Sequence, residues 1–277
     1  PLIMHVPDWQ AAQPYLLQPL PESARALAGL LMPGPLTMLL PKTSLVPDLL
    51  TAGSPKVAIR IPAHPMAKAL LQSLPFPLAA PSANRFGYVS PVTARHVFEG
   101  LQGRLPYILD GGACQVGLES TIIDFEGDEL IIRRAGSITA AQLEAITGQK
   151  PIFKTDAADH PVAPGMLQVH YATHTPLLLG PAATFASTIA GKKIMLLGWG
   201  SQESLLQKAV LPDNCYCLEV MSLSPDKDLT EVAANLFAGM RHADQANADF
   251  IVIHPFPDEG IGRAINDRLK RAAAAIH

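Results

Sequence analysis

Four short polar clusters carry the residue types that bind phosphates and carboxylates. The most informative one covers residues 110–124, where a glycine-rich loop runs into a β-branched strand that starts at Ser120. Glycines let a backbone approach a ligand closely, and a loop held by a rigid sheet is a usual place for binding groups. An ordinary hairpin loop has the same composition, so this stretch alone leaves both interpretations open.

The other three clusters also lie at strand ends or in tight turns. Lys56 and Arg60 are four residues apart on a predicted strand, which places both on one face of a sheet. Residues 80–84 follow a short apolar strand, where hydroxyls and backbone amides suit phosphate or carboxylate recognition. Arg133 and Arg134 end a strand, and their planar guanidinium groups also suit phosphate. A solvated sheet edge, a proline turn and an exposed arginine pair are the structural alternatives.

The chain lacks the signatures of several other enzyme classes. No Gly-x-Ser-x-Gly elbow surrounds a serine, and no Gly-x-Gly-x-x-Gly follows a predicted strand. His170 and His174 are followed at once by Pro176, so they do not form a zinc-binding helix. These motifs therefore give no sign of a hydrolase nucleophile, a zinc site or a dinucleotide-binding loop.

Composition narrows the class of protein further. The chain has 277 residues, 48% of them apolar and 16% charged, which is enough for two domains with full cores. A net charge of −3 without a basic face disfavours binding to duplex nucleic acid. Three cysteines do not make a disulfide framework, and there is neither a signal peptide nor an apolar run of ~20 residues. We therefore expect a cytoplasmic protein that does not contact a membrane.

The order of predicted elements is that of an α/β protein with two domains. In residues 1–148, apolar runs alternate with helical patterns and several connections are hairpin-short, which predicts a mixed twisted sheet. Residues 149–177 are rich in proline and aromatic side chains and are predicted to be an ordered linker or lid. Residues 178–277 predict a small Rossmann-like α/β domain. The patterns predict a helix at 22–31, strands at 57–61, 77–80, 107–109, 121–125 and 130–134, and helix caps at Thr93, Gly148 and Asp228.

The motifs, taken together and in this order, resemble the YrdC/Sua5 family. They are Pro-Leu-Ile-x-His-Val at 1–6, Val-Ala-Ile-Arg-Ile-Pro at 57–62, Ala-Pro-Ser-Ala-Asn at 80–84, Asp-Gly-Gly-x-Cys…Gly-Leu-Glu-Ser-Thr at 110–121 and Arg-Arg-Ala-Gly at 133–136. The linker and the tail at 259–273 are similar to the Sua5 members, so the resemblance covers the whole chain. Two family motifs that precede Pro-Leu-Ile-x-His-Val, Pro-Thr-Glu-Thr-x-Tyr-Gly-Leu and Lys-x-Arg-Pro, are absent, which implies an N-terminally incomplete catalytic domain.

The resemblance implies an L-threonylcarbamoyladenylate synthase, a nucleotidyltransferase that acts in t6A37 modification of tRNA. Such an enzyme forms threonylcarbamoyl-AMP and pyrophosphate from L-threonine, bicarbonate or CO2, and ATP. The resemblance also implies Mg2+ held mainly by the ATP phosphates, and the t6A-transfer machinery and tRNA as partners. By motif, the implied L-threonine site contains Arg60, Ala80 and Ser120, and the implied ATP site contains Lys56, Ser82, Ser90, Arg134 and Tyr171.

Two alternatives stay open at this point. A non-catalytic or truncated relative would bind nucleotide or RNA through the concave face of the first domain, and the absent N-terminal motifs favour this reading. A carbamoyl transferase of the hydrogenase-maturation kind is the other alternative. The Sua5-like tail and the absence of paired Cys-x-x-Cys motifs argue against it. The set of Arg60, Ser82, Ser120 and Arg134 favours the synthase.

Overall fold

The computed structural model describes residues 1–155 and 163–275, which form two compact units. The first unit consists of Pro1–Pro81 and Glu119–Leu167, and the second of Ser82–Leu118 and Gln168–His277. The segment Ser82–Leu118 therefore groups with the C-terminal part of the chain, although in sequence it interrupts the first unit. The domain boundary expected at residue 148 stays a prediction. No helix in the described ranges is long and apolar enough to cross a membrane.

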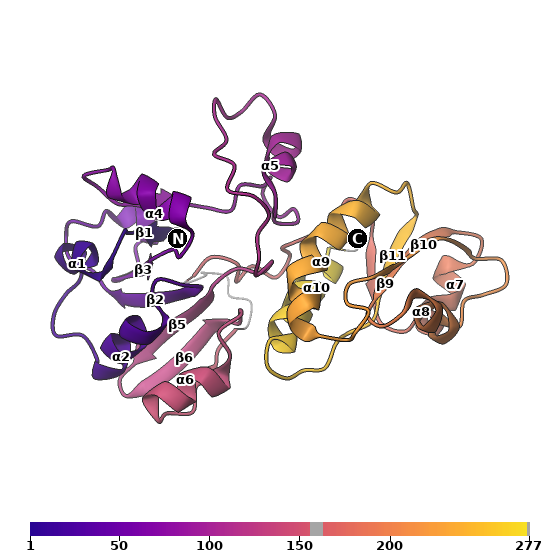
Figure 1. Ribbon diagram of the computed structural model, residues 1–277. Helices are drawn as coiled ribbons and strands as arrows, with labels where there is room; N and C mark the ends of the chain where they lie inside the picture. The colour runs from indigo at the N-terminus through magenta and orange to yellow at the C-terminus, as the bar shows by residue number, and fades with distance from the viewer. Residues whose placement is uncertain (156–162, 276–277) are drawn as a thin grey trace. The chain divides into compact units, whose positions relative to one another are not determined.

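A mixed sheet forms the centre of the first unit (Figure 1). Its strands in the described residues are β1 (Ile3–His5), β2 (Leu36–Pro41), β3 (Lys56–Arg60), β4 (Leu78–Ala80), β5 (Thr121–Glu126), β6 (Glu129–Arg134) and β7 (Ile152–Phe153). Their order across the sheet is β4-β1-β3-β2-β5-β6-β7. β1 runs parallel to β3 and β2 runs parallel to β5, whereas β5 and β6 form an antiparallel hairpin. The predicted mixed sheet is confirmed, because only a short turn joins strands such as β5 and β6.

Two amphipathic helices cover one face of this sheet. α2 (Glu22–Leu31) and α6 (Ala140–Thr147) bury Leu27 and Leu143 completely, in the same cluster as Met38 of β2. Each such leucine contributes about 1.5–3 kcal/mol by leaving water. The remaining helices of the unit are α1 (Trp9–Ala12), the 3-10 helix η1 (Gln13–Tyr15), α3 (Asp48–Thr51) and α4 (Pro65–Gln72).

The opposite face of the sheet carries a small apolar patch, which we call the floor. Two buried residues of the predicted linker, Ala163 and Met166, pack on it. Part of the linker therefore covers this face of the first unit. The floor consists of Ile3, Leu39, Ala58 and Ile122.

A parallel sheet forms the centre of the second unit, as predicted for a Rossmann-like domain. Its described strands are β8 (Leu177–Leu179), β9 (Lys193–Gly198), β10 (Tyr216–Ser222) and β11 (Phe250–Ile253), in the order β10-β9-β11-β8. All neighbouring strands are parallel. The two longer helices, α9 (Leu229–Asp244) and α10 (Gly262–Ala273), cover one face of this sheet (Figure 1). The shorter helices α7 (Ala186–Ile189) and α8 (Gln202–Ala209) cover the other face, and the 3-10 helix η2 (Ala182–Phe185) precedes α7.

The segment Ser82–Leu118 contains α5 (Ala94–Leu101), which Thr93 caps as predicted. The predicted strand at 107–109 is wrong, because these residues pair with no strand in the described structure and Tyr107 is 89% exposed. An apolar run becomes a strand only where a neighbour accepts its backbone hydrogen bonds. Gly117 packs on α9 so closely that a Cβ atom would overlap the carbonyl of Ala233. The close approach that this glycine permits is therefore to a helix of its own unit.

Candidate functional site

Strand register brings the predicted site residues of the first unit onto one face of its sheet. Ala80 pairs with Ile3 and Arg134 pairs with Ile122, and both partners belong to the floor. Side chains two residues apart on a strand share a face. Lys56 and Arg60 are two residues from Ala58, and Ser120 is two residues from Ile122, so all three also lie beside the floor. The structure thus places Lys56, Arg60, Ala80, Ser120 and Arg134 on one face of the sheet, with Ala80 on its edge strand.

Ser120 is the centre of a buried hydrogen-bond cluster. Its Oγ lies 2.7 Å from Oγ1 of Thr37. Arg134 donates from Nη2 to the Ser120 carbonyl at 2.9 Å and to its hydroxyl at 3.1 Å, and from Nε to the carbonyl at 3.1 Å. Nη1 of the same arginine reaches the carbonyl of Pro164 in the linker at 3.1 Å. All these groups except Pro164 are buried, so the hydroxyl of Ser120 is held in one orientation.

The turn after β6 lies directly against this cluster. Thr121 Oγ1 donates to the carbonyl of Ile138 at 2.8 Å and accepts from its amide at 3.0 Å. A Cβ atom on Gly136 would lie 2.5 Å from the backbone nitrogen of Thr121. Only glycine lets the two backbones approach this closely, which explains the glycine that ends the Arg-Arg-Ala-Gly motif.

His5 adjoins Arg60 and is a further candidate site residue, which the sequence patterns alone did not single out. The two residues pair in register on β1 and β3, and Nε of Arg60 donates to the carbonyl of Gly34 at 3.2 Å. Burial and the charge of Arg60 lower the pKa of His5 to about 4, so the imidazole is neutral at pH 7. Its Nδ1 is buried and makes no hydrogen bond of regular geometry among the described residues, although the backbone of Leu78 and Ile3 acts on the imidazole in the direction that raises its pKa. This nitrogen is therefore available to a polar ligand beside the Arg60 guanidinium.

Lys56 takes part in a chain of ion pairs on the same face. Its Nζ lies 2.5 Å from Oδ1 of Asp124 and donates to the carbonyl of Phe125 at 2.8 Å. The carboxylate of Asp124 also accepts from Arg133 at 2.8 Å, and its side chain is only 4% exposed. Arg133 in turn contacts Glu126, and the hydrogen bond from Lys154 lowers the pKa of that carboxyl. The ammonium of Lys56 is thus already bound to the protein.

The other three predicted residues, Ser82, Ser90 and Tyr171, lie in the second unit. Ser82 is exposed, whereas Ser90 is buried. The ring of Tyr171 is 1% exposed and stacks on Phe237 at 5.4 Å between centroids. The guanidinium of Arg268 lies 5.3 Å from the same ring. Tyr171 is therefore a fixed part of the second unit.

The metal-binding side chains of the described residues do not gather into a site. Within residues 1–155 and 163–275, no three His, Cys, Asp or Glu side chains lie close enough together to hold a metal ion. The site contains guanidinium groups, hydroxyls and an imidazole instead. These groups fit a metal that arrives on the oxygens of a phosphate ligand.

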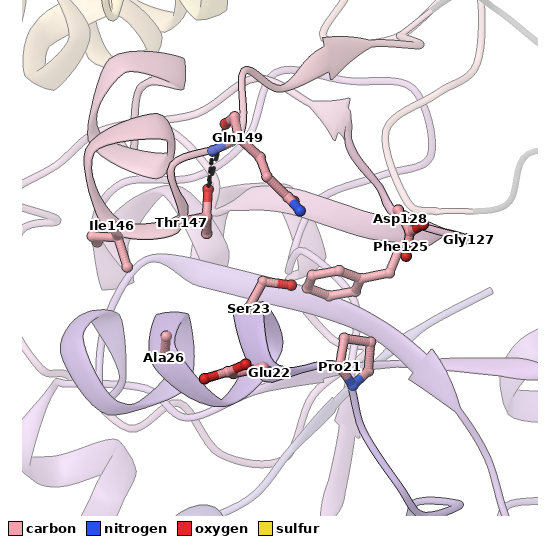
Figure 2. Close-up of a pocket in the computed structure, with 10 residues that line it drawn as sticks. All are labelled: Pro21, Glu22, Ser23, Ala26, Phe125, Gly127, Asp128, Ile146, Thr147 and Gln149. Atoms are coloured by element: carbon pink, nitrogen blue, oxygen red, sulfur yellow. Dashed lines mark hydrogen bonds between the residues drawn. The ribbon is translucent and has the colours of Figure 1, made fainter.

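A separate cavity of about 420 Å³ lies on the helix-covered side of the first unit (Figure 2). It is lined by the start of α2, the turn between β5 and β6, and the end of α6, with Phe125 and Ile146 as apolar walls. The predicted site residues do not line it. The candidate site therefore remains the floor together with Lys56, Arg60, Ala80, Ser120 and Arg134 on the same face, which we call its polar rim.

Two family models together match nearly the whole chain. Residues 1–136 match the Sua5, YciO and YrdC model, which is described as telomere recombination. Residues 138–274 match the model of the threonylcarbamoyl-AMP synthase C-terminal domain.

Individual relatives agree with these matches over the same length. Threonylcarbamoyl-AMP synthase of Bacillus subtilis (strain 168) is 37% identical over 99% of this chain and 79% of its own length. That of Pyrococcus abyssi (strain GE5 / Orsay) is 33% identical over 99% of this chain and 80% of its own length. The crystal structure of P. abyssi Sua5 complexed with L-threonine matches with a TM-score of 0.85 and 33% identity, covering 99% of this chain and 80% of that one.

Proposed function

Because this chain belongs to the Sua5 family of threonylcarbamoyl-AMP synthases, we propose that the polar rim of the floor binds L-threonine for that reaction. The enzyme is a transferase of t6A tRNA modification that uses threonine and ATP. The P. abyssi relative, whose fold this chain shares, was crystallised with L-threonine.

The threonine carboxylate binds the guanidinium of Arg60, whose planar fork matches it. The hydroxyl of Ser120 and the backbone at Ala80 lie on the same face of the sheet and complete the pocket. Neutral His5 offers Nδ1 to the amino or hydroxyl group of threonine. We add this residue because a buried nitrogen without a regular hydrogen bond is costly unless a ligand satisfies it.

The reaction needs two successive bond formations. The threonine amine attacks CO2, which bicarbonate supplies, and becomes a carbamate after losing a proton. A carbamate oxygen then attacks the α-phosphorus of ATP, and the bond to pyrophosphate breaks. Neither step needs a protein nucleophile, so the protein contributes positioning and positive charge. The linker residues over the floor, Ala163 and Met166, exclude water from the mixed anhydride.

The ATP contacts that we propose are Lys56, Ser82, Ser90, Arg134 and Tyr171. Arg134 supplies charge next to Ser120, and the hydroxyls of the two serines suit phosphate oxygens. Mg2+ would be held mainly by the ATP phosphates and would supply positive charge that offsets theirs. We further propose the t6A-transfer machinery and tRNA as partners. A cytoplasmic location suits a chain whose three cysteines form no disulfide in the described structure.

The observation that carries the proposal is the buried cluster of Thr37, Ser120 and Arg134 beside Arg60 and His5. The test is release of pyrophosphate from ATP by the purified chain, with threonine or bicarbonate omitted in turn. We expect release only when all three substrates are present. Release that continues without threonine, or the absence of threonine binding by calorimetry, would contradict the proposal.

A further inference from the structure

Arg241 of α9 binds the backbone of the segment that carries Ser90. Its Nε donates to the carbonyl of Ser90 at 3.1 Å, and its Nη2 contacts the carbonyl of Val89. The same guanidinium lies 4.8 Å from the ring centroid of Tyr88. Arg241 is 4% exposed, so these contacts are protected from water. One side chain thus holds three consecutive residues, two of them through carbonyls that only a forked donor satisfies together.

Asp244 lies one turn further along α9 and binds the same segment together with the linker. Its carboxylate accepts from the hydroxyl of Tyr88 at 2.7 Å and from the amide of Thr175 at 2.7 Å. It also contacts Nδ1 of His174 at 2.9 Å. The side chain of Asp244 is 2% exposed. Burial and the hydrogen bond to Asp244 raise the pKa of Tyr88, so its hydroxyl stays protonated and donates at neutral pH.

The two held segments are also bonded to each other. The amide of Val89 donates to the carbonyl of Ala172 at 3.2 Å, and the amide of Ala172 donates to the carbonyl of Gly87 at 2.8 Å. Ala172 directly follows Tyr171, whose ring is buried against α9 at Phe237. α9 therefore holds Ser90 and Tyr171 as one rigid group, although they lie far apart in sequence.

We propose that Arg241 and Asp244 are positioning residues for ATP, because they fix the backbone that presents Ser90 and Tyr171. The inference rests on the proposed contact of Ser90 and Tyr171 with ATP, and it gives the C-terminal part of the chain an indirect role in nucleotide binding. Neither side chain touches the substrate. Both act through the segment of residues 88–90 and the linker.

The test compares Arg241→Met with the parent protein. The KM values for ATP and for threonine and the hydrogen exchange of the amides in residues 85–92 are measured for both. Loss of two buried hydrogen bonds should raise the KM for ATP about tenfold, leave the KM for threonine within about twofold, and speed exchange in that segment. Arg95→Met is the matched control, because the side chain of Arg95 is 84% exposed in the same unit and its ion pair is with Glu99, on its own helix. It should change neither constant. Tyr88→Phe removes one hydroxyl and should give a smaller change of the same kind.

Equal increases in both KM values, or an unchanged KM for ATP with normal exchange in residues 85–92, would overturn the inference. If Arg241→Met does not fold, Arg241→Lys and Tyr88→Phe provide the same comparison with less disturbance. An unchanged KM for ATP in Ser90→Ala would instead overturn the assignment of Ser90. The two failures are distinguishable, because Arg241→Met would still loosen residues 85–92 in the second case.

Discussion

Arg134 holds the backbone carbonyl and the hydroxyl of Ser120 at the same time, from the neighbouring strand of the hairpin. Arg134 on β6 therefore fixes the orientation of the Ser120 hydroxyl, which directly precedes β5. The same guanidinium also reaches the linker at Pro164. Because these bonds are buried, the positions of a predicted threonine contact and of the linker depend on one side chain.

Replacing Arg134 by methionine should destabilise the protein by about 2–4 kcal/mol, since the buried carbonyl of Ser120 loses its donors. The KM for threonine should rise as well, because the serine hydroxyl is no longer oriented. Urea unfolding and steady-state kinetics measure both effects. Arg25→Met on the exposed side of α2 is the control and should stay within about 0.5 kcal/mol. An unchanged free energy of unfolding for Arg134→Met would show that the cluster is not structural.

Arg60→Ala should raise the KM for threonine far more than the KM for ATP. The reason is that its guanidinium is the proposed partner of the threonine carboxylate, and a charged hydrogen bond is worth about 1.5–3 kcal/mol. Pyrophosphate release measured against each substrate separates the two constants. Increases of equal size for both substrates would remove Arg60 from the threonine site.

His5 should make the protein less stable as the pH falls from about 6.5 to about 4. Its pKa in the fold is lowered to about 4 by burial and by Arg60, whereas the unfolded chain takes up the proton near 6.5. The unfolded state therefore binds more protons in this interval, and protonation favours it. Between pH 6.5 and pH 4, the free energy of unfolding should fall less in His5→Gln than in the parent protein. Titration of His5 by NMR in Arg60→Ala should show a higher pKa than in the parent, and an equal value would assign the shift to burial alone.

Lys56→Met should lower stability by about 1–2 kcal/mol, because Asp124 keeps Arg133 as a partner and loses only one of its two cations. The KM for ATP should also rise if the proposed nucleotide contact holds. Urea unfolding gives the first quantity, and pyrophosphate release against ATP concentration gives the second. A loss of stability with no change in the KM for ATP would confine Lys56 to its ion pair.

Gly136→Ala should destabilise the protein by about 1–3 kcal/mol or more, because the added methyl group meets the backbone of Thr121 and Glu119. Gly29→Ala is a matched control within the same unit. Nothing lies within 4 Å of its Cβ position on α2, and alanine favours helices by about 0.5–1 kcal/mol over glycine. The Tm of thermal unfolding should therefore fall in Gly136→Ala and rise in Gly29→Ala. A higher Tm in both variants would mean that the turn at Gly136 can make room for the added methyl group.

Local patterns were sufficient for most helices and strands. The apolar period gave α2 its observed bounds, Glu22–Leu31, and Thr93 and Asp228 cap their helices as predicted. Gly148 ends α6 with φ of 69°, a conformation that glycine adopts without strain. The hairpin of β5 and β6 was also predictable, because only a short turn separates two β-branched runs. Each of these features depends on residues a few positions apart.

Contacts between distant positions could be learned only from the folded chain. His5 meets Arg60 because β1 lies beside β3, and Lys56 meets Asp124 across the same sheet. The run at 107–109 has the composition of a strand but no neighbour to bond with in the described structure. The motifs thus identified the family and the residue types of the site. The sheet register determined which of these residues lie together, because hydrogen-bonded strand pairing brings distant residues to a common face.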